Sequence, residues 1–209
     1  MTLLDSRLKK QIDFLIEIDK VKNIFRMTYV SDKSRKENDA EHSWHLGIMA
    51  FLLSEYIKEE ININKVIKMV LIHDLVEIYA GDTFAFDEKG HEDKYDREKA
   101  SADKILGMLP EDQGKEFHEL WEEFEECKTM EAKYGAMLDR LQPLLLNYAT
   151  EGGSWKDHNI TVEQVYKRNE IVLNEGPKEF RDLVNYVVDE CIKKGYISGM
   201  KTKEEISMY

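Results

Sequence analysis

The amino-acid sequence predicts an all-α protein that folds as a single-domain helical bundle. Apolar side chains recur at the three- and four-residue spacing of helices along most of the chain, whereas the alternating pattern of half-buried strands is scarce. Only three prolines occur among the 209 residues, a length that favours one domain with a sizeable core over two. We expect this domain to span residues 1–195, followed by a peripheral polar tail at 196–209.

Composition restricts the partners that the protein can bind. The chain carries 42 acidic and 30 basic residues, a formal net charge of -12. Nucleic acids and anionic membranes require basic patches, so we expect neither as a partner, although a bound cation can still attract a small anion. The two cysteines form no CxxC motif, and no apolar run approaches the roughly 18 residues of a membrane span. The first residues lack a signal-peptide pattern, which favours a cytoplasmic protein.

Three helices are predicted in the first half of the chain. Residues 5–23 form the first helix, and residues 24–37 are expected to be irregular and polar. The second helix, over residues 39–58, follows Asn38, which forms a capping-box pattern with Glu41. The third starts at residue 65 and ends at Gly81, since a glycine commonly terminates a helix.

The third predicted helix carries polar residues in an unusual setting. His73 and Asp74 stand within an apolar run, and Glu77 follows them at helical spacing, so that all three can share one side. Asp82 comes directly after Gly81. A buried aspartate is costly unless it is paired or binds a metal. The pair therefore indicates either hydrogen bonds within the core, the commoner role of an isolated His-Asp pair, or a metal site.

The second half is predicted to be helical over residues 94–108, 111–126, 129–149, 161–174 and 177–194. The polar segment 82–93, which contains two phenylalanines, is either a mobile loop over the site or a plain connector. A second polar loop is expected at 151–158. Asp139 lies among apolar residues with no basic residue three or four positions away, so it requires solvent or a partner on another helix.

Three predicted helices thus carry potential metal ligands: His42, the His73–Asp74 pair and Asp139. Two imidazoles and two carboxylates suit Mn²⁺, Co²⁺, Ni²⁺, Fe²⁺, Mg²⁺ or Zn²⁺ without selecting sharply among them. His45 lies one turn after His42 and could face the same place. Arg26 or Arg35 could bring a guanidinium group to an anion, although polar loops of this kind are usually only solvated. Spacing alone does not show that these residues converge.

The arrangement resembles the metal-dependent phosphohydrolases of the HD-domain superfamily. Residues 35–42, which read RKENDAEH, resemble the R-x-E-N-x-x-E-H segment of the bacterial 5'-deoxynucleotidases in this superfamily. Residues 73–82, which read HDLVEIYAGD, resemble their H-D-x-x-E-x-x-x-G-D segment. Residues 109–112, 119–124 and 131–133 are similar to the eukaryotic HD-domain-containing 5'-deoxynucleotidase relatives.

This resemblance implies an HD-type helical bundle and a role for each site residue. Its implied metal ligands are His42, His73, Asp74 and Asp139. Glu77 is implied as the general acid/base, Asp82 as a residue that positions the nucleotide or a proton, and Arg26 as a substrate contact, with Arg35 as a second candidate. The close bacterial relatives have Trp after the arginine where this chain has Met27, so the choice between deoxyribose and ribose stays open.

The expected function is metal-dependent hydrolysis of nucleoside 5'-monophosphates, with deoxynucleotides as the expected substrates and a homodimer as the expected assembly. One alternative is another HD-type activity, such as a nucleotide phosphodiesterase or triphosphohydrolase. A second is a helical binding module that retains the metal without turnover, and a third is a dimerisation scaffold. The pairing of Glu77 with Asp82 favours an enzyme, because a pure binding site needs neither an acid/base nor a proton-positioning group.

Overall fold

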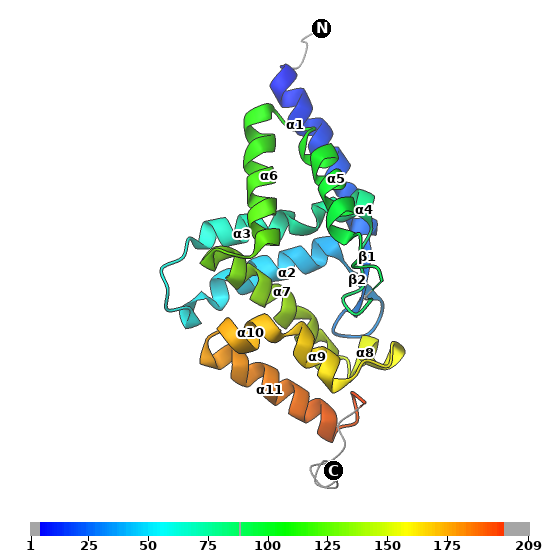
Figure 1. Cartoon of the computed structure of the whole chain (residues 1–209). Coiled ribbons are helices and arrows are strands. Elements are labelled where there is room, and N and C mark those ends of the chain that lie inside the picture. The colour runs from blue at the N-terminus through cyan, green and yellow to red at the C-terminus, as the bar shows by residue number, and fades with distance from the viewer. Residues whose placement is uncertain (1–4, 88, 199–209) are drawn as a thin grey trace. The chain divides into compact units, whose positions relative to one another are not determined.

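The computed structural model describes residues 5–87 and 89–198. In this part the chain is mostly helical, with one small two-stranded sheet, so the all-α prediction is confirmed (Figure 1). The described residues form two compact units. The first unit comprises residues 5–26 and 37–139, and the second comprises 27–36 and 140–198.

The first unit begins with α1 (Ser6–Glu17), which continues into a 3₁₀ helix, η1 (Ile18–Asn23). The carboxylate of Asp5 caps α1 by accepting hydrogen bonds from two backbone N–H groups of the first turn. This stabilises the start of the helix, whose first N–H groups have no partner within the helix. The helix predicted over residues 5–23 is therefore confirmed, with a 3₁₀ second part.

Two short strands follow in the segment that the sequence predicted to be irregular. Strand β1 (Phe25–Tyr29) pairs with β2 (Lys36–Asn38) in the two-stranded sheet. The prediction was wrong here because the strands are too short for alternation to show, although aromatic and β-branched side chains in β1 favour strand formation. The backbone N–H of Asp39 donates to the carbonyl of Ile24, so helix α2 begins directly beside the start of β1.

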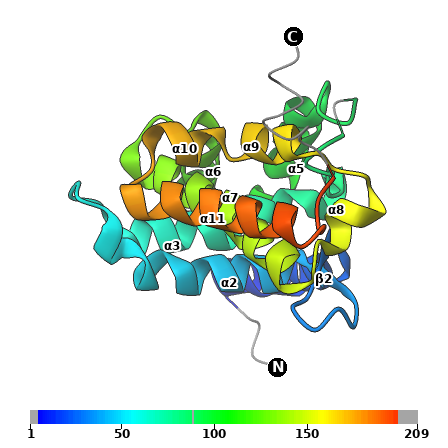
Figure 2. The same ribbon diagram turned by 90° about the horizontal axis from the view of Figure 1, so that it is seen from below.

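Helix α2 (Asp39–Leu52) starts with the predicted capping box. The N–H of Glu41 donates to Asn38 Oδ1 at 3.0 Å, and the N–H of Asn38 donates to Glu41 Oε2 at 3.2 Å. The helix ends about six residues earlier than predicted and is followed by a 3₁₀ turn, η2 (Ser54–Tyr56). Helix α3 (Ile63–Ile72) packs along α2 (Figures 1 and 2).

The third predicted helix is not continuous. After α3 the chain tightens into a 3₁₀ helix, η3 (His73–Val76), and resumes as a short helix, α4 (Glu77–Ala80). Gly81, with φ of +77°, ends α4 as predicted. In a 3₁₀ turn, residues three apart lie above each other, which aligns Asp74 with Glu77 more closely than an α-helix would.

Helices α5 (Lys94–Leu106), α6 (Glu111–Glu126) and the first half of α7 (Met130–Ala149) complete the first unit. Their apolar faces supply the buried side chains of Ala102, Ile105, Trp121 and Leu138. Arg97 on α5 anchors the segment before it by donating to the carbonyls of Ala80 and Gly90 and to Thr83 Oγ1. The mobility predicted for residues 82–93 stays a prediction.

The second unit contains the other half of α7 and helices α8 (Gly153–Asp157), α9 (Val162–Arg168), α10 (Glu170–Glu175) and α11 (Lys178–Lys193) (Figure 2). Helix α8 lies where a polar loop was predicted. The helix predicted over 161–174 is interrupted at Asn169, whose side chain donates to the carbonyl of Val165. Asn competes with a helical backbone in this way, which explains the break.

The start of the predicted tail packs within the second unit. Ile197 is buried, and Ser198 forms a parallel bridge with Thr161. The remainder of that tail, residues 199–209, lies outside the described residues. No helix of the described part is both long and apolar enough to cross a membrane.

Candidate metal centre

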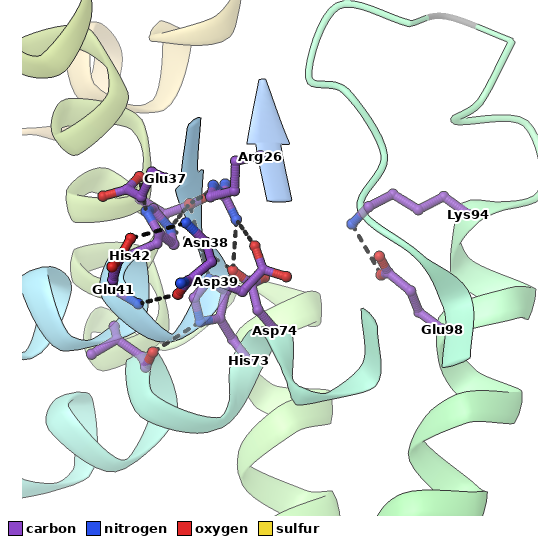
Figure 3. Close-up of polar contacts among 12 residues, drawn as sticks. Arg26, Glu37, Asn38, Asp39, Glu41, His42, His73, Asp74, Lys94 and Glu98 are labelled. Carbon is purple, nitrogen blue, oxygen red and sulfur yellow. Dashed lines mark hydrogen bonds and ion pairs between the residues drawn. The ribbon is translucent and has the colours of Figure 1, made fainter. Parts of the chain in front are cut away.

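Three elements of the first unit bring the four predicted metal ligands together. Helix α2 supplies His42, η3 supplies His73 and Asp74, and α7 supplies Asp139. His42 Nε2 lies 3.0 Å from Asp139 Oδ1. His73 Nε2 lies 3.1 Å from Asp74 Oδ1, and both residues are labelled in Figure 3. All four side chains are buried, and His42, His73 and Asp139 each offer a ligand atom within 4.8 Å of the others. The partner on another helix that Asp139 requires is therefore His42.

The hydrogen bond at the back of His73 sets the state of its ring. Nδ1 lies 2.9 Å from the carbonyl oxygen of Val70, which can only accept, so Nδ1–H is the donor. In the neutral ring, Nε2 then carries a lone pair, and this buried atom has no hydrogen-bond partner among the described residues. An imidazole fixed through Nδ1 to a backbone carbonyl is the usual form of a metal-binding histidine. The side chains present therefore fit a divalent cation.

Burial favours the neutral form of His42, whereas Asp74 raises the pKa of His73. The ring of His42 is fully buried, and burial, together with the nearby charge of Arg26, lowers the pKa of His42 to about 4. Nε2 faces Asp139, while Nδ1 lies 3.8 Å from a carboxylate oxygen of the buried Glu37. Two imidazoles beside two carboxylates form the mixed nitrogen and oxygen set that suits first-row divalent metals and Mg²⁺.

Arg26 reaches into the same cluster from strand β1. Its Nη1 donates to Asp74 Oδ2 at 2.8 Å and to Asp39 Oδ1 at 3.2 Å (Figure 3). Its Nη2 lies 3.9 Å from Asp139 Oδ1. Burial alone would lower the pKa of Arg26, but the nearby carboxylates have the larger effect and raise this pKa well above its ordinary value. The guanidinium group is therefore permanently charged beside the predicted metal ligands.

A second carboxylate group adjoins the first. Asp39, Asp74 and Glu77 are buried and offer oxygens within 4.8 Å of one another. Burial and the charge of Asp74 raise the pKa of Asp39 to about 7 and raise that of Glu77 well above its ordinary value. Glu77 Oε2 and Asp39 Oδ2 have no hydrogen-bond partner in the described part of the chain. A carboxyl group that exchanges a proton near neutral pH is what general acid/base chemistry requires.

Sequence reasoning missed Asp39. An acidic residue in the first turn of a helix is normally explained by the helix dipole and the cap, so Asp39 was not considered for the site. The available signal was its spacing, because a residue three positions before His42 lies on the same side of α2. Its side chain is completely buried, which a residue that only complements a helix dipole does not require.

The remaining predicted residues lie at the edge of the cluster or in the second unit. Asp82 follows α4 directly, and burial, with the charge of Asp74, raises its pKa, so it belongs to the same electrostatic group. His45 is half-buried beside Trp44, with ring centroids 6.1 Å apart. Arg35 belongs to the second unit, where it is exposed and donates to the carbonyl of Lys36. Its predicted contact with substrate stays a prediction.

Comparison with known proteins decides the family. A family model for the HD domain matches residues 18–181. The chain belongs to the HD domain family. The match covers most of both units, which agrees with a single HD-type domain, and the resemblance to HD-domain phosphohydrolases noted from the sequence is confirmed.

Named relatives of this HD domain include two 5'-deoxynucleotidases. The protein 5'-deoxynucleotidase HDDC2 of Homo sapiens is 30% identical over 135 residues, 64% of this chain and 65% of that protein. The protein of the same name from Dictyostelium discoideum is 34% identical over 146 residues, 67% of this chain and 77% of that protein. The chain thus spans slightly less than two thirds of the length of the human relative.

A solved structure shares the fold of this HD domain almost from end to end. It is the crystal structure of a "Predicted metal-dependent phosphohydrolase" from Magnetospirillum magnetotacticum MS-1. The two chains are 48% identical and superpose with a TM-score of 0.86, over 93% of this chain and 97% of the other. The prediction of an HD-type helical bundle is confirmed.

Proposed function

We propose that this HD domain is a metal-dependent hydrolase of nucleoside 5'-monophosphates, with deoxynucleotides as its substrates. The observation that carries the proposal is the buried convergence of His42, His73, Asp74 and Asp139, with His73 Nε2 directed at the carboxylates and its Nδ1 held by a backbone carbonyl. The names of the relatives support phosphate chemistry and the class of substrate. His42, His73, Asp74 and Asp139 hold one divalent cation in this proposal, and Mn²⁺, Co²⁺, Mg²⁺, Ni²⁺, Fe²⁺ and Zn²⁺ are the candidates.

The side chains around that cation divide the work of hydrolysis. A bound divalent metal supplies Lewis-acid polarisation of the phosphoryl group and makes water more acidic. Glu77 handles the proton of the attacking water or of the departing 5'-oxygen, because its carboxyl group is buried next to Asp74. Arg26, which lies on β1, stabilises negative charge on the phosphoryl oxygens. Asp82 positions the nucleotide or a proton.

Turnover rather than passive metal binding is favoured by the second carboxylate group. A site that only holds a cation has no use for Asp39 and Glu77, two further buried carboxylates beside the four ligands. Burying them is costly, which is expected at a site where the charge is used in a reaction. Other nucleotide phosphoesters, including cyclic nucleotides and triphosphates, are the alternative substrates of the same residues.

The decisive experiment measures phosphate release from deoxy- and ribonucleoside 5'-monophosphates, with di-, tri- and cyclic nucleotides beside them. Metal-stripped protein receives each candidate metal singly, and Asp74→Ala and Glu77→Gln are assayed in parallel. We expect metal-dependent release from monophosphates, abolished in Asp74→Ala. Glu77→Gln should keep its metal, measured by elemental analysis, but lose at least about 100-fold in kcat, the typical contribution of a general acid or base.

Three results would contradict the proposal. Full activity in Glu77→Gln would remove this residue from the reaction. Release from cyclic or triphosphorylated substrates alone would make the protein a different HD-type hydrolase. Metal-loaded, folded protein that is inert towards every ester would instead support a binding module.

We further propose that the protein acts as a homodimer in the cytoplasm. The chain has only two cysteines, far apart in the sequence and without a CxxC pattern, which is usual for a protein of a reducing compartment. An uncharged apolar stripe on α2, consisting of Trp44, Ile48, Phe51 and Leu52, supports self-association. The relatives contribute no observation on assembly.

A further inference from the structure

Lys94, the first residue of α5, is a largely buried cation with spare hydrogen-bonding capacity. Its Nζ donates to Glu98 Oε2 at 3.0 Å, and the two side chains are 28% and 3% exposed (Figure 3). Glu98 is its sole hydrogen-bond partner in the part of the chain that the structure describes. An ammonium group has three N–H donors, so two of them remain for another acceptor.

The register of α5 directs Lys94 towards the segment that carries the site. Glu98, Ser101, Ala102 and Ile105 are buried and define the inner face of this helix. Ser101 Oγ donates to the carbonyl of Val76, the last residue of η3. Lys94 precedes Ser101 by seven residues, which is about two helical turns, so it lies on the same face.

Arg97 holds the start of α5 against the end of α4. Its guanidinium group donates to the carbonyl of Ala80 at 2.8 Å, one residue before Gly81 and two before Asp82. Because Arg97 is one turn after Lys94, this contact places the turn of α5 that carries Lys94 beside the end of α4. In Figure 3 the side chain of Lys94 extends from α5 towards the side on which Asp74 and Arg26 lie.

The charge of Lys94 interacts with the site carboxylates. Burial tends to lower the pKa of Lys94, but Glu98, Glu125 and Asp74 outweigh it and raise the pKa, so the group is charged at neutral pH. Its charge in turn helps to lower the pKa of Asp82, against the larger effect of burial. Lys94 thus interacts electrostatically with carboxylates of the cluster, although its hydrogen bond is to Glu98.

A phosphate substrate needs such a cation. Asp39, Asp74, Glu77, Asp82 and Asp139 provide five carboxyl groups around the cluster, and Arg26 is already bonded to two of them. A phosphate monoester brings roughly −1.5 to −2 further charges at pH 7. Lysine is a common phosphate ligand because it presents a compact charge with several donors.

We propose that Lys94 is an anion-binding residue of this site, whose ammonium group donates to an oxygen of the substrate's phosphate group while Glu98 holds the side chain in place. The proposal rests on the function proposed above, because it names a further substrate contact at the same metal centre. In this arrangement Arg26 and Lys94 approach the phosphate from different elements, β1 and α5.

The test compares two lysines in similar surroundings. Lys65 on α3 is paired with Glu123 at 2.6 Å and is 34% exposed, so it matches Lys94 in both pairing and exposure, and it belongs to no part of the proposed site. Lys94→Met, Lys94→Arg and Lys65→Met would be prepared in the full chain and loaded with Mn²⁺ or Mg²⁺. Steady-state kinetics gives KM and kcat for a deoxynucleoside 5'-monophosphate, and calorimetry gives the Kd of inorganic phosphate.

We expect Lys94→Met to weaken phosphate binding and to raise KM, each by about tenfold or more, as befits the loss of one charge-assisted hydrogen bond. The change in kcat should be smaller, Lys94→Arg should recover part of the affinity, and Lys65→Met should match the wild type. Unchanged Kd and KM in folded Lys94→Met, or an equal loss in Lys65→Met, would overturn the proposal.

A double variant and a phosphate-binding measurement cover the cases in which Lys94→Met does not fold or the wild-type protein shows no turnover. If Lys94→Met does not fold, because Glu98 is left buried and unpaired, the double variant with Glu98→Gln removes that charge, and it must show the same loss of phosphate affinity. If the wild-type protein hydrolyses no nucleotide, phosphate binding that still depends on Lys94 supports this proposal while the proposed function fails. If the protein hydrolyses nucleotides but neither turnover nor phosphate binding depends on Lys94, the proposed function stands and the proposal for Lys94 fails.

Discussion

At the scale of single residues, Gly152 tolerates substitution least among the glycines that the structure describes. Its φ is +83°, and a Cβ atom there would lie 2.0 Å from the carbonyl oxygen of Tyr196 within the second unit. Gly195 has a similar φ of +67° but no atom within 4 Å of the same position. The two glycines therefore separate the cost of the left-handed backbone from the cost of a steric clash.

We predict that Gly152→Ala destabilises the protein more than Gly195→Ala. An alanine in left-handed backbone costs about 1–2 kcal/mol at either position. At Gly152 the clash should add about 1–3 kcal/mol, the usual cost of forcing extra volume into a packed region. Urea unfolding followed by circular dichroism measures both free energies. Equal losses in the two variants would show that the backbone at 196 moves aside without cost.

The same scale shows how far the site was predictable. His42, His73, Asp74 and Asp139 could be proposed from residue type, the apolar setting and family resemblance, and the structure brings their ligand atoms together. Asp39 could not be found in this way because an acidic residue at a helix start complements the helix dipole, and Lys94 because a lysine in a polar segment is ordinarily a surface residue. Their burial depends on β1 and α4, which are distant in sequence.

At the scale of elements, two capping boxes with the same geometry stand at helices of different importance. Asn38 and Glu41 cap α2, whose first turn carries His42, whereas Thr161 and Gln164 cap α9 in the second unit. In each box, the side chain of the first residue accepts a hydrogen bond from the backbone N–H of the second. The side chain of the second residue accepts a hydrogen bond from the backbone N–H of the first. A lost cap frays the first turn of its helix.

We predict that Asn38→Ala and Thr161→Ala each lower the free energy of unfolding by about 0.5–2 kcal/mol. Only Asn38→Ala should also weaken metal binding, by roughly tenfold or more, because fraying at α2 releases His42 from its orientation. Chemical denaturation and metal titration measure the two effects. If Asn38→Ala bound metal as the wild type does, the start of α2 would not be what orients His42.

Elements also mark where sequence periodicity stops being informative. The boundaries of α5 and α6 agree with the predicted helices to within two residues, because each has a clear apolar stripe and a distinct end. The 3₁₀ segment η3 does not differ from an α-helix in its apolar pattern over four residues, so the break after Ile72 was not predicted. This break matters because it sets the directions of His73 and Asp74.

At the scale of the whole molecule, the apolar stripe on α2 is the strongest feature for self-association. Trp44, Ile48, Phe51 and Leu52 recur at helical spacing and are between 38% and 64% exposed. No Asp, Glu, Lys or Arg occurs between Glu41 and Glu55, although the chain has a net charge of -12. A two-fold interface pairs a patch with itself, so an uncharged patch lets two acidic chains meet without placing like charges together.

We predict that the protein is dimeric and that Leu52→Glu makes it monomeric. Leu15→Glu on α1 is the matched control, because Leu15 is 61% exposed and Leu52 is 60% exposed. Light scattering coupled to size-exclusion chromatography, with sedimentation to follow concentration dependence, measures the mass of each variant. A dimer that survives Leu52→Glu, or that is lost equally in Leu15→Glu, would place the interface elsewhere.

The all-α class, most helix boundaries, the α2 cap and four candidate metal ligands could be predicted from the amino-acid sequence and its family resemblance. These follow from local spacing and residue chemistry, together with motifs that span only eight to ten residues. Only the tertiary structure decided that α2, η3 and α7 meet, that Arg26 and Asp39 join them, and that α5 directs Lys94 towards this cluster. Such convergence depends on packing between segments up to about a hundred residues apart, which no local pattern encodes.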